Sequence, residues 1–596
     1  MSLYPHHRIQ KACVLTLFLA LIAGCGGVSQ VNLRPSITSD TETVLEQDSG
    51  IVVAHVVNAG TAPLPFNFLT VTPKNFNESE KIKAERLEAV GTVVGESSFF
   101  VSSIPAGNYS VSNIMGYHSS GEYWYQRWAS GDIELGTFSV KPGEITDLGT
   151  LIYYPKSQEE KYIETLLRSP GSTNKTLVQS YAPFLDYHPG QVLSWDEDGN
   201  EDQRFSVYAA TVQNPVVYNE RYIAPNNSVY FIGKLGFILQ RTEDGDWIEQ
   251  AVETDADLNA IAVNDEGSIA IGGEQSAIFF KKKEAEEWQT IEIPRPYVVA
   301  DILFTADGQL DILMWHRKGA KIERINPLSP KNSVTQASYV PYWGWKTASG
   351  EAITPPKQKG YSKPTPELMQ LAYVYSQAID DKFYIFAGEK KVHGDSFPYI
   401  APVNKRTTIS YTQTNSKIEA VGKIGEAVDR TLDAGAIKLG IKKASFWSWT
   451  GKDKYLRFDK EKNDWIPINM AVNRCLGLTK KAMRCKVNGE IVTRNGYFSF
   501  LGIPVFSSPL DAIAFVEFTS STSSKDGKPD LGIVTTNDGG ESWTVISKEL
   551  PGKYCASTIP EVKDALLVAC SGMSSDFYQS TDNGKSWEHV RQSENF

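Results

Sequence analysis

Apolar and polar residues alternate with a period of two in a series of short segments near the start of the chain. The clearest of these are residues 51–57, 99–101, 104–111, 137–140 and 148–154. Such a period marks β-strands with one buried face, and short strands at this spacing predict a β-sandwich. We therefore assign residues 48–155 to an N-terminal β-sandwich domain.

The pattern changes over residues 156–190. Residues 157–160 read Ser-Gln-Glu-Glu, a capping box that is typical of the start of a helix. Apolar residues then recur at helical spacing before Pro170, namely Tyr162, Ile163, Leu166 and Leu167. The sequence predicts a short amphipathic helical linker between two β domains.

The remaining residues, 191–596, contain a repeated turn motif of the form Ser/Thr-x-Asp-x-Gly-x-x-Trp. Two full copies have their Trp residues 44 positions apart: Thr536, Asp538, Gly540 and Trp543, then Ser580, Asp582, Gly584 and Trp587. The Asp carboxylate can accept backbone N–H groups of its own turn, and Gly can adopt positive φ. Shorter copies end at Trp247, Trp288 and Trp465. A period of about 40–45 residues with four short strands predicts a β-propeller. About seven blades fit, with six and eight left open.

Two of these segments resemble known families. The repeated turn resembles the Asp box of sialidase-like, or BNR-repeat, β-propellers, which implies that the boxes are structural, that their Trp residues pack between blades, and that they lie away from the ligand-binding face. Residues 105–109, Pro-Ala-Gly-Asn-Tyr, resemble a turn of carboxypeptidase-regulatory-like and other transthyretin-like β-sandwich domains. That resemblance implies a spacer or adhesion module. The predicted fold class is all-β.

The first residues have the character of an export signal. Arg8 and Lys11 precede a run of apolar and small residues at 12–23, and residues 21–25 read Leu-Ile-Ala-Gly-Cys. This end resembles the bacterial lipobox, which implies removal of residues 1–24 and lipidation of Cys25. An ordinary signal peptide with an incidental Cys25 is the alternative. Residues 25–47 would form a flexible tether. Gly26, in place of Asp, implies by resemblance to enterobacterial lipoproteins an outer-membrane location, on either its periplasmic or its surface face.

The composition of the chain argues against some classes of binding partner. The net charge of −11 argues against nucleic acid, whose phosphates require a basic surface. Four Cys residues would remain after export in an oxidising compartment, and we predict disulfides Cys475–Cys485 and Cys555–Cys570, since each pair flanks a turn signal. Two other pairings stay open. No Cys-x-x-Cys occurs, so zinc is disfavoured.

Catalytic patterns are incomplete. Sialidases need three Arg residues, a Tyr–Glu pair and an Asp, but their Phe/Tyr-Arg-Ile-Pro signature is absent; residues 293–296 read Ile-Pro-Arg-Pro. We therefore predict no catalytic residues, no metal and no cofactor. The acidic segment 196–202 could be a calcium loop, but a solvated acidic turn is preferred. The sequence favours a membrane-anchored, extracytoplasmic binding or scaffold lipoprotein for an unknown protein or glycan. A divergent sialidase-like glycoside hydrolase is the alternative.

Overall fold

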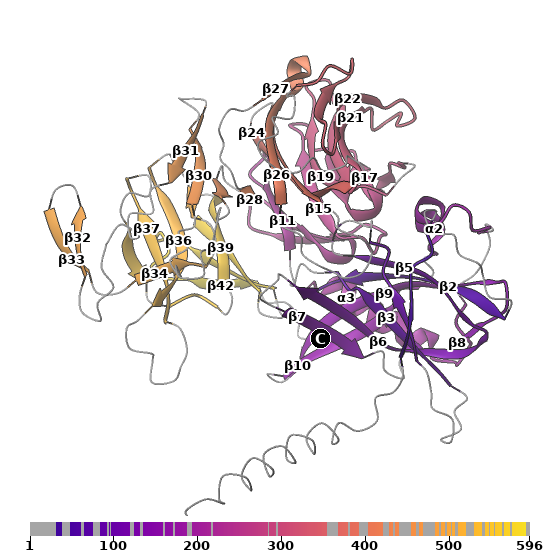
Figure 1. The fold of residues 1–596 in the computed structure, drawn as a ribbon. Helices are drawn as coiled ribbons and strands as arrows, with labels where there is room; N and C mark the ends of the chain where they lie inside the picture. The colour runs from indigo at the N-terminus through magenta and orange to yellow at the C-terminus, as the bar shows by residue number, and fades with distance from the viewer. Residues whose placement is uncertain are drawn as a thin grey trace, which may run out of the picture.

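The computed structural model describes much of the chain between residues 31 and 591 (Figure 1). The described residues are 31–38, 48–60, 65–74, 84–91, 95, 97–119, 124–130, 135–158, 161–170, 173–187, 194–215, 218–283, 285–293, 296–353, 368–379, 382–391, 403–420, 428–432, 436–439, 454–459, 464–468, 483–487, 490–494, 497–501, 504–506, 510–519, 530–538, 543–547, 549–552, 555–562, 565–571 and 575–591.

Two sheets make up the N-terminal unit. The first has the order β1 (Val31–Arg34), β4 (Ala84–Glu88), β3 (Phe68–Pro73), β6 (Gly107–Ser119) and β7 (Trp124–Ser130), and β8 (Phe138–Val140) also pairs with β6. The second has the order β10 (Lys161–Arg168), β9 (Ile145–Gln158), β2 (Ser49–Asn58) and β5 (Ser98–Pro105). Both sheets contribute to one apolar core, with Leu69 and Ile114 from the first and Val52 and Phe100 from the second.

The predicted helix at residues 157–167 is wrong. Residues 161–168 form strand β10, which pairs antiparallel with β9 so that Leu166 faces Tyr153 and Leu167 faces Ile152. Both leucines are buried, Leu166 in the core between the sheets and Leu167 on the opposite face against helix α3. A strand buried on both faces places adjacent apolar residues together, and pairs of adjacent apolar residues also occur at the spacing of an amphipathic helix. The helices of this region are α2 (Lys175–Tyr181) and α3 (Glu201–Gln213).

Seven antiparallel sheets of four or five strands follow in the described part of residues 218–591, here numbered sheets 1 to 7 in chain order. Sheet 1 is β11 (Tyr218–Ile223), β12 (Val229–Gly233), β13 (Phe237–Arg241) and β14 (Trp247–Ala251); sheet 2 is β15 (Leu258–Val263), β16 (Ile269–Gly273), β17 (Ile278–Lys281) and β18 (Gln289–Thr290); sheet 3 is β19 (Val298–Phe304), β20 (Leu310–His316), β21 (Gly319–Ile325), β22 (Val334–Val340) and β23 (Gly344–Thr347); sheet 4 is β24 (Met369–Ile379), β25 (Lys382–Lys391), β26 (Val403–Thr412) and β27 (Lys417–Ala420).

The last three sheets continue the pattern. Sheet 5 is β28 (Val428–Leu432), β29 (Ala436–Leu439), β30 (Lys454–Asp459) and β31 (Asp464–Ile468); sheet 6 is β34 (Tyr497–Phe500), β35 (Val505–Phe506), β36 (Ala512–Thr519), β37 (Asp530–Thr536) and β38 (Thr544–Ser547); sheet 7 is β39 (Cys555–Val562), β40 (Ala565–Ser571), β41 (Ser575–Ser580) and β42 (Glu588–Arg591). A separate hairpin of β32 (Met483–Val487) and β33 (Glu490–Arg494) lies between sheets 5 and 6 in sequence.

Four pairs of neighbouring sheets pack face to face in the described part of the chain, and the last sheet packs on the first. Shared apolar cores join sheets 1 and 2, 2 and 3, 3 and 4, and 6 and 7. Phe577 of sheet 7 packs in one cluster with Phe231 of sheet 1, and its ring centroid lies 4.8 Å from that of Trp247. A succession of four-stranded meanders whose last member packs on its first is the architecture of a β-propeller.

Candidate binding face of the propeller

The Asp boxes are turns between the third and fourth strands of their sheets. In the second box, one oxygen of the Asp582 carboxylate accepts the backbone N–H groups of Lys585 (3.0 Å) and Ser586 (2.8 Å), and the other accepts the Ser586 hydroxyl (2.6 Å). The Ser580 hydroxyl donates to Asp582 and accepts the Gly584 N–H, both at 2.8 Å. Hydrogen bonds from Ser586, by its hydroxyl above all, lower the pKa of Asp582 to about 2.

The first box repeats part of this arrangement. The Thr536 hydroxyl donates to Asp538 at 2.7 Å, and Trp543 is buried against Ala512, Ala514 and Val534 of its own sheet. Gly540 lies outside the described residues. Trp587 packs between sheets 6 and 7, with Phe515 and Val568 among its neighbours. In both boxes the Ser or Thr hydroxyl and the Asp carboxylate bond to each other within the turn.

The boxes define one end of the propeller, here called the box end. Strand directions alternate in a meander, so the turns between second and third strands lie at the opposite end, here called the hairpin end. Two of these turns share one backbone shape: η2 (Lys234–Gly236) and η3 (Glu274–Ser276) carry Leu235 and Gln275 at φ of 57° and 58°. Both turns contact the N-terminal unit, which therefore covers the hairpin end of sheets 1 and 2.

The contact made by η2 is apolar. Leu235 is buried in a cluster with Val57 and Ile152 of the second N-terminal sheet, and Val207 of α3 packs against that cluster. The hairpin is held by a buried ion pair between Lys234 and Asp257 of the following loop. A residue at positive φ is strained unless its surroundings hold it, and the packing of Leu235 does so.

The contact made by η3 is polar. The buried Glu274 carboxylate accepts the Ser97 backbone N–H at 3.3 Å and also the Ser97 hydroxyl. The Gln275 amide reaches Ser97 Oγ at 3.3 Å and His55 Nε2 at 3.4 Å. Burial lowers the pKa of His55 to about 4, so its ring is neutral at neutral pH.

The hairpin end of sheet 3 exposes an aromatic turn that joins β22 to β23. Within it Val340 is 39% exposed and Trp343 50% exposed, and Leu368, just before the first strand of sheet 4, is 40% exposed. The Tyr342 backbone N–H donates to Glu389 of β25 at 3.0 Å, which fixes the turn on sheet 4. Exposed apolar side chains that gather in one patch are typical of interaction surfaces, whereas single ones are common on any protein.

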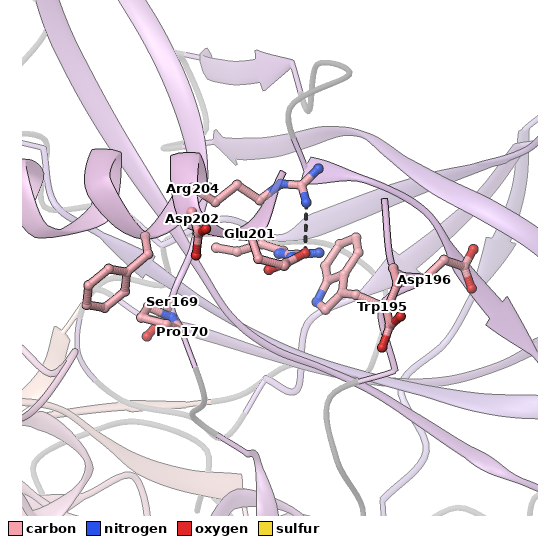
Figure 2. A pocket seen from close by; sticks show the side chains of 10 residues that line it. Ser169, Pro170, Trp195, Asp196, Glu201, Asp202 and Arg204 are labelled. Atoms are coloured by element: carbon pink, nitrogen blue, oxygen red, sulfur yellow. Dashed lines mark hydrogen bonds and ion pairs between the residues drawn. The ribbon is translucent and has the colours of Figure 1, made fainter. Parts of the chain in front are cut away.

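A hollow of about 400 Å³ lies beside α3 (Figure 2). The Arg168 guanidinium stacks over the Trp195 ring at 4.6 Å and donates to the Leu135 carbonyl at 3.0 Å. Arg168 and Arg204 both bond to the Glu201 carboxylate, as Figure 2 shows for Arg204. These cations are therefore neutralised within the wall of the hollow.

The acidic segment 196–202 forms part of this wall. Arg204 donates to Asp198 at 2.7 Å and, as the largest cause, holds the pKa of that carboxyl well below its usual range. Asp196 accepts the Thr137 hydroxyl at 2.6 Å. Among the residues that the structure describes, no group of three His, Cys, Asp or Glu side chains could hold a metal ion.

The structure joins Cys555 and Cys570 in the predicted disulfide. They face each other in the β39–β40 hairpin, next to a register shift. Cys25, Cys475 and the side chain of Cys485 lie outside the described part. Sequence patterns missed the contacts of Leu235, Glu274 and Tyr342, because each depends on residues distant in the chain.

No protein-family model and no curated protein matches the chain. Solved structures that resemble it include YCF48 from Cyanidioschyzon merolae, at 11% identity and a TM-score of 0.31 over 59% of this chain and 92% of that one. BamB from Moraxella catarrhalis has 9% identity and a TM-score of 0.29 over 59% and 93% of the two chains. A GH74 enzyme from Niastella koreensis has 13% identity and a TM-score of 0.27 over 64% and 66%. Likenesses at this level assign no function to this chain.

Proposed function

We propose that this chain is an extracytoplasmic binding protein, anchored to a membrane by lipid on Cys25, whose propeller offers a protein-binding surface at its hairpin end. The observation that carries the proposal is the exposure of Val340 and Trp343 on sheet 3 and of Leu368 at the same end of sheet 4. Water solvates such side chains poorly, so a partner that covers them gains free energy from the hydrophobic effect.

The architecture supports a scaffold role. We propose that sheets 1 to 7 are seven blades and that the two N-terminal sheets form a β-sandwich that serves as a spacer above the membrane. The contacts of Leu235 and Glu274 fix this spacer to the propeller. In the described part of the chain no helix is long and apolar enough to cross a membrane.

Site-specific photo-crosslinking tests the binding surface. A photoreactive residue at position 343 should crosslink one defined partner in the cell envelope, and Leu368→Ala should weaken that product. The matched control is position 248 on β14, since Ile248 is 41% exposed and Trp343 is 50% exposed. Equal products from both positions, or none from position 343, would contradict the proposal.

The anchor has a separate test. Cys25→Ala should move the protein from the membrane fraction to the periplasmic fraction, and unchanged partitioning would contradict lipidation. Turnover of fluorogenic sialosides or aryl glycosides by the purified protein would instead support the glycosidase alternative.

A further inference from the structure

Arg317 occupies the β20–β21 hairpin of sheet 3, at the hairpin end of the propeller. Its Nη1 donates to the carbonyl oxygens of Leu371 and Ala372, both at 3.3 Å, and its own carbonyl accepts the Leu371 N–H at 2.8 Å. Its Nε is buried without a hydrogen-bond partner. The guanidinium thus donates to two neutral carbonyl oxygens, and some of its five N–H donors remain available for a further acceptor.

A second cation lies beside it. Lys390 of β25 pairs in register with Gln370, the neighbour of Leu371, and this brings its strand next to the Arg317 hairpin. Burial lowers the pKa of Lys390 to about 8, and repulsion from Arg317 adds to the effect. Burial also lowers the pKa of Arg317.

The pair differs from two other cations of the described residues, Arg324 and Lys234, although the buried Arg241 likewise bonds only to neutral oxygens, those of Gly245 and Gln579. Arg324, in the same sheet as Arg317, makes two 2.8 Å contacts with Asp311, and Lys234 pairs with Asp257. Within the described residues, neither Arg317 nor Lys390 forms an ion pair with a carboxylate. Among the described residues the two cations are therefore poorly compensated, and an anion bound between them would supply the missing charge.

A third donor comes from the N-terminal unit. Tyr181, the last residue of α2, packs its ring on Phe99 with centroids 5.9 Å apart, and its hydroxyl lies within electrostatic range of Arg317. Burial, the largest cause, raises the pKa of Tyr181 to about 12, so its hydroxyl keeps its proton and can donate.

We propose that Arg317, Lys390 and Tyr181 form a binding site for a carboxylate group at the seam between the N-terminal unit and the propeller. Guanidinium, ammonium and phenol groups all present donors, which suits an oxyanion. Trp343 and Leu368, exposed on the same end of sheets 3 and 4, favour a carboxylate that carries an apolar substituent.

The site is tested with N-acetyl-leucine as the probe and N-acetyl-leucinamide, which lacks the carboxylate, as the control ligand. Binding is followed by the change in Tm of the full mature chain at millimolar ligand, in a buffer of low anion content. N-acetyl-leucine should raise Tm and the amide should not. Arg317→Gln and Lys390→Gln should each weaken the apparent affinity at least tenfold, since each removes a charge-assisted hydrogen bond. Tyr181→Phe, which keeps the ring, should weaken it less.

Lys318→Gln is the matched control, because Lys318 is exposed and adjacent to Arg317 in the chain. It should leave binding unchanged. In the absence of ligand, Lys390→Gln should raise Tm, because it removes a poorly compensated charge. Tighter binding of inorganic phosphate than of N-acetyl-leucine would overturn the carboxylate assignment. Equal binding by the variants and the parent chain, or no binding at all, would overturn the site. Neither result depends on lipid anchoring or on a protein partner at Trp343.

Discussion

The backbone N–H of Ser97 in the N-terminal unit donates to the carboxylate of Glu274 at the tip of a propeller hairpin, 3.3 Å away and 177 positions later in the chain. The same carboxylate accepts the Ser97 hydroxyl. We predict that Glu274→Ala lowers the free energy of unfolding by about 1–3 kcal/mol, because it leaves buried donors without an acceptor. Urea unfolding measures the loss, and hydrogen exchange should show a faster Ser97 amide.

Glu266→Ala is the control for this prediction. Glu266 lies in an exposed turn at the box end of the same sheet. Its removal should change neither stability nor the exchange of Ser97. If the two variants behaved alike, the link between Glu274 and Ser97 would not contribute to the attachment of the two units.

The features that could be predicted from the sequence are those formed by residues close together in the chain. The Asp boxes and the Cys555–Cys570 pair are each formed within one hairpin, so residue types and spacing are enough to find them. Strand β10 was missed because Leu166 and Leu167 are buried on opposite faces, which depends on what packs against each face. The proximity of Arg317 and Lys390 could not be predicted, because it depends on how the β20–β21 hairpin of sheet 3 packs beside sheet 4.

The buried His55 predicts an acid-sensitive junction. Its pKa falls from 6.5 in an unfolded chain to about 4 in the fold, so the unfolded state binds more protons between these pH values. Stability should therefore decrease as pH falls from about 6.5 to about 4, by up to about 3 kcal/mol. His55→Gln should remove this part of the pH dependence in urea titrations. An unchanged pH profile in the variant would show that His55 is not responsible.

Because sheet 7 packs on sheet 1 through Phe577, we predict that Phe577→Ala affects strand β14 of sheet 1 as well as sheet 7. Phe577→Ala should cost about 3–5 kcal/mol, because the side chain is buried between the last sheet and the first. It should also speed hydrogen exchange in β14, whose Trp247 contacts Phe577. Phe515→Ala is the matched control, a buried phenylalanine in the core that joins sheets 6 and 7. It should cost similar stability without affecting β14, and equal exchange in both variants would contradict closure through Phe577.

The Cys555–Cys570 disulfide should make the stability of the fold depend on redox conditions. Cys555 and Cys570 are 15 positions apart, and closing a loop of this size stabilises the fold by about 3 kcal/mol in the chain-entropy model. The double variant Cys555→Ala with Cys570→Ala should lose about this amount, and reductant should then have no further effect through this pair. Peptide mapping without reduction identifies the bond directly. Free thiols at both positions in protein purified without reductant would contradict it.

Protonation of Asp582 in the second Asp box should also destabilise the fold, at a lower pH than protonation of His55 does. Because hydrogen bonds lower the pKa of Asp582 from 3.8 to about 2, its ionised form stabilises the fold. This stabilisation is complete above about pH 4 and is lost as pH falls toward 2. Asp582→Asn should therefore lower Tm at pH 7, and the difference from the parent chain should shrink as the pH approaches 2. A Tm difference for Asp582→Asn that stayed constant down to pH 2 would mean that the charge of Asp582 does not stabilise its turn.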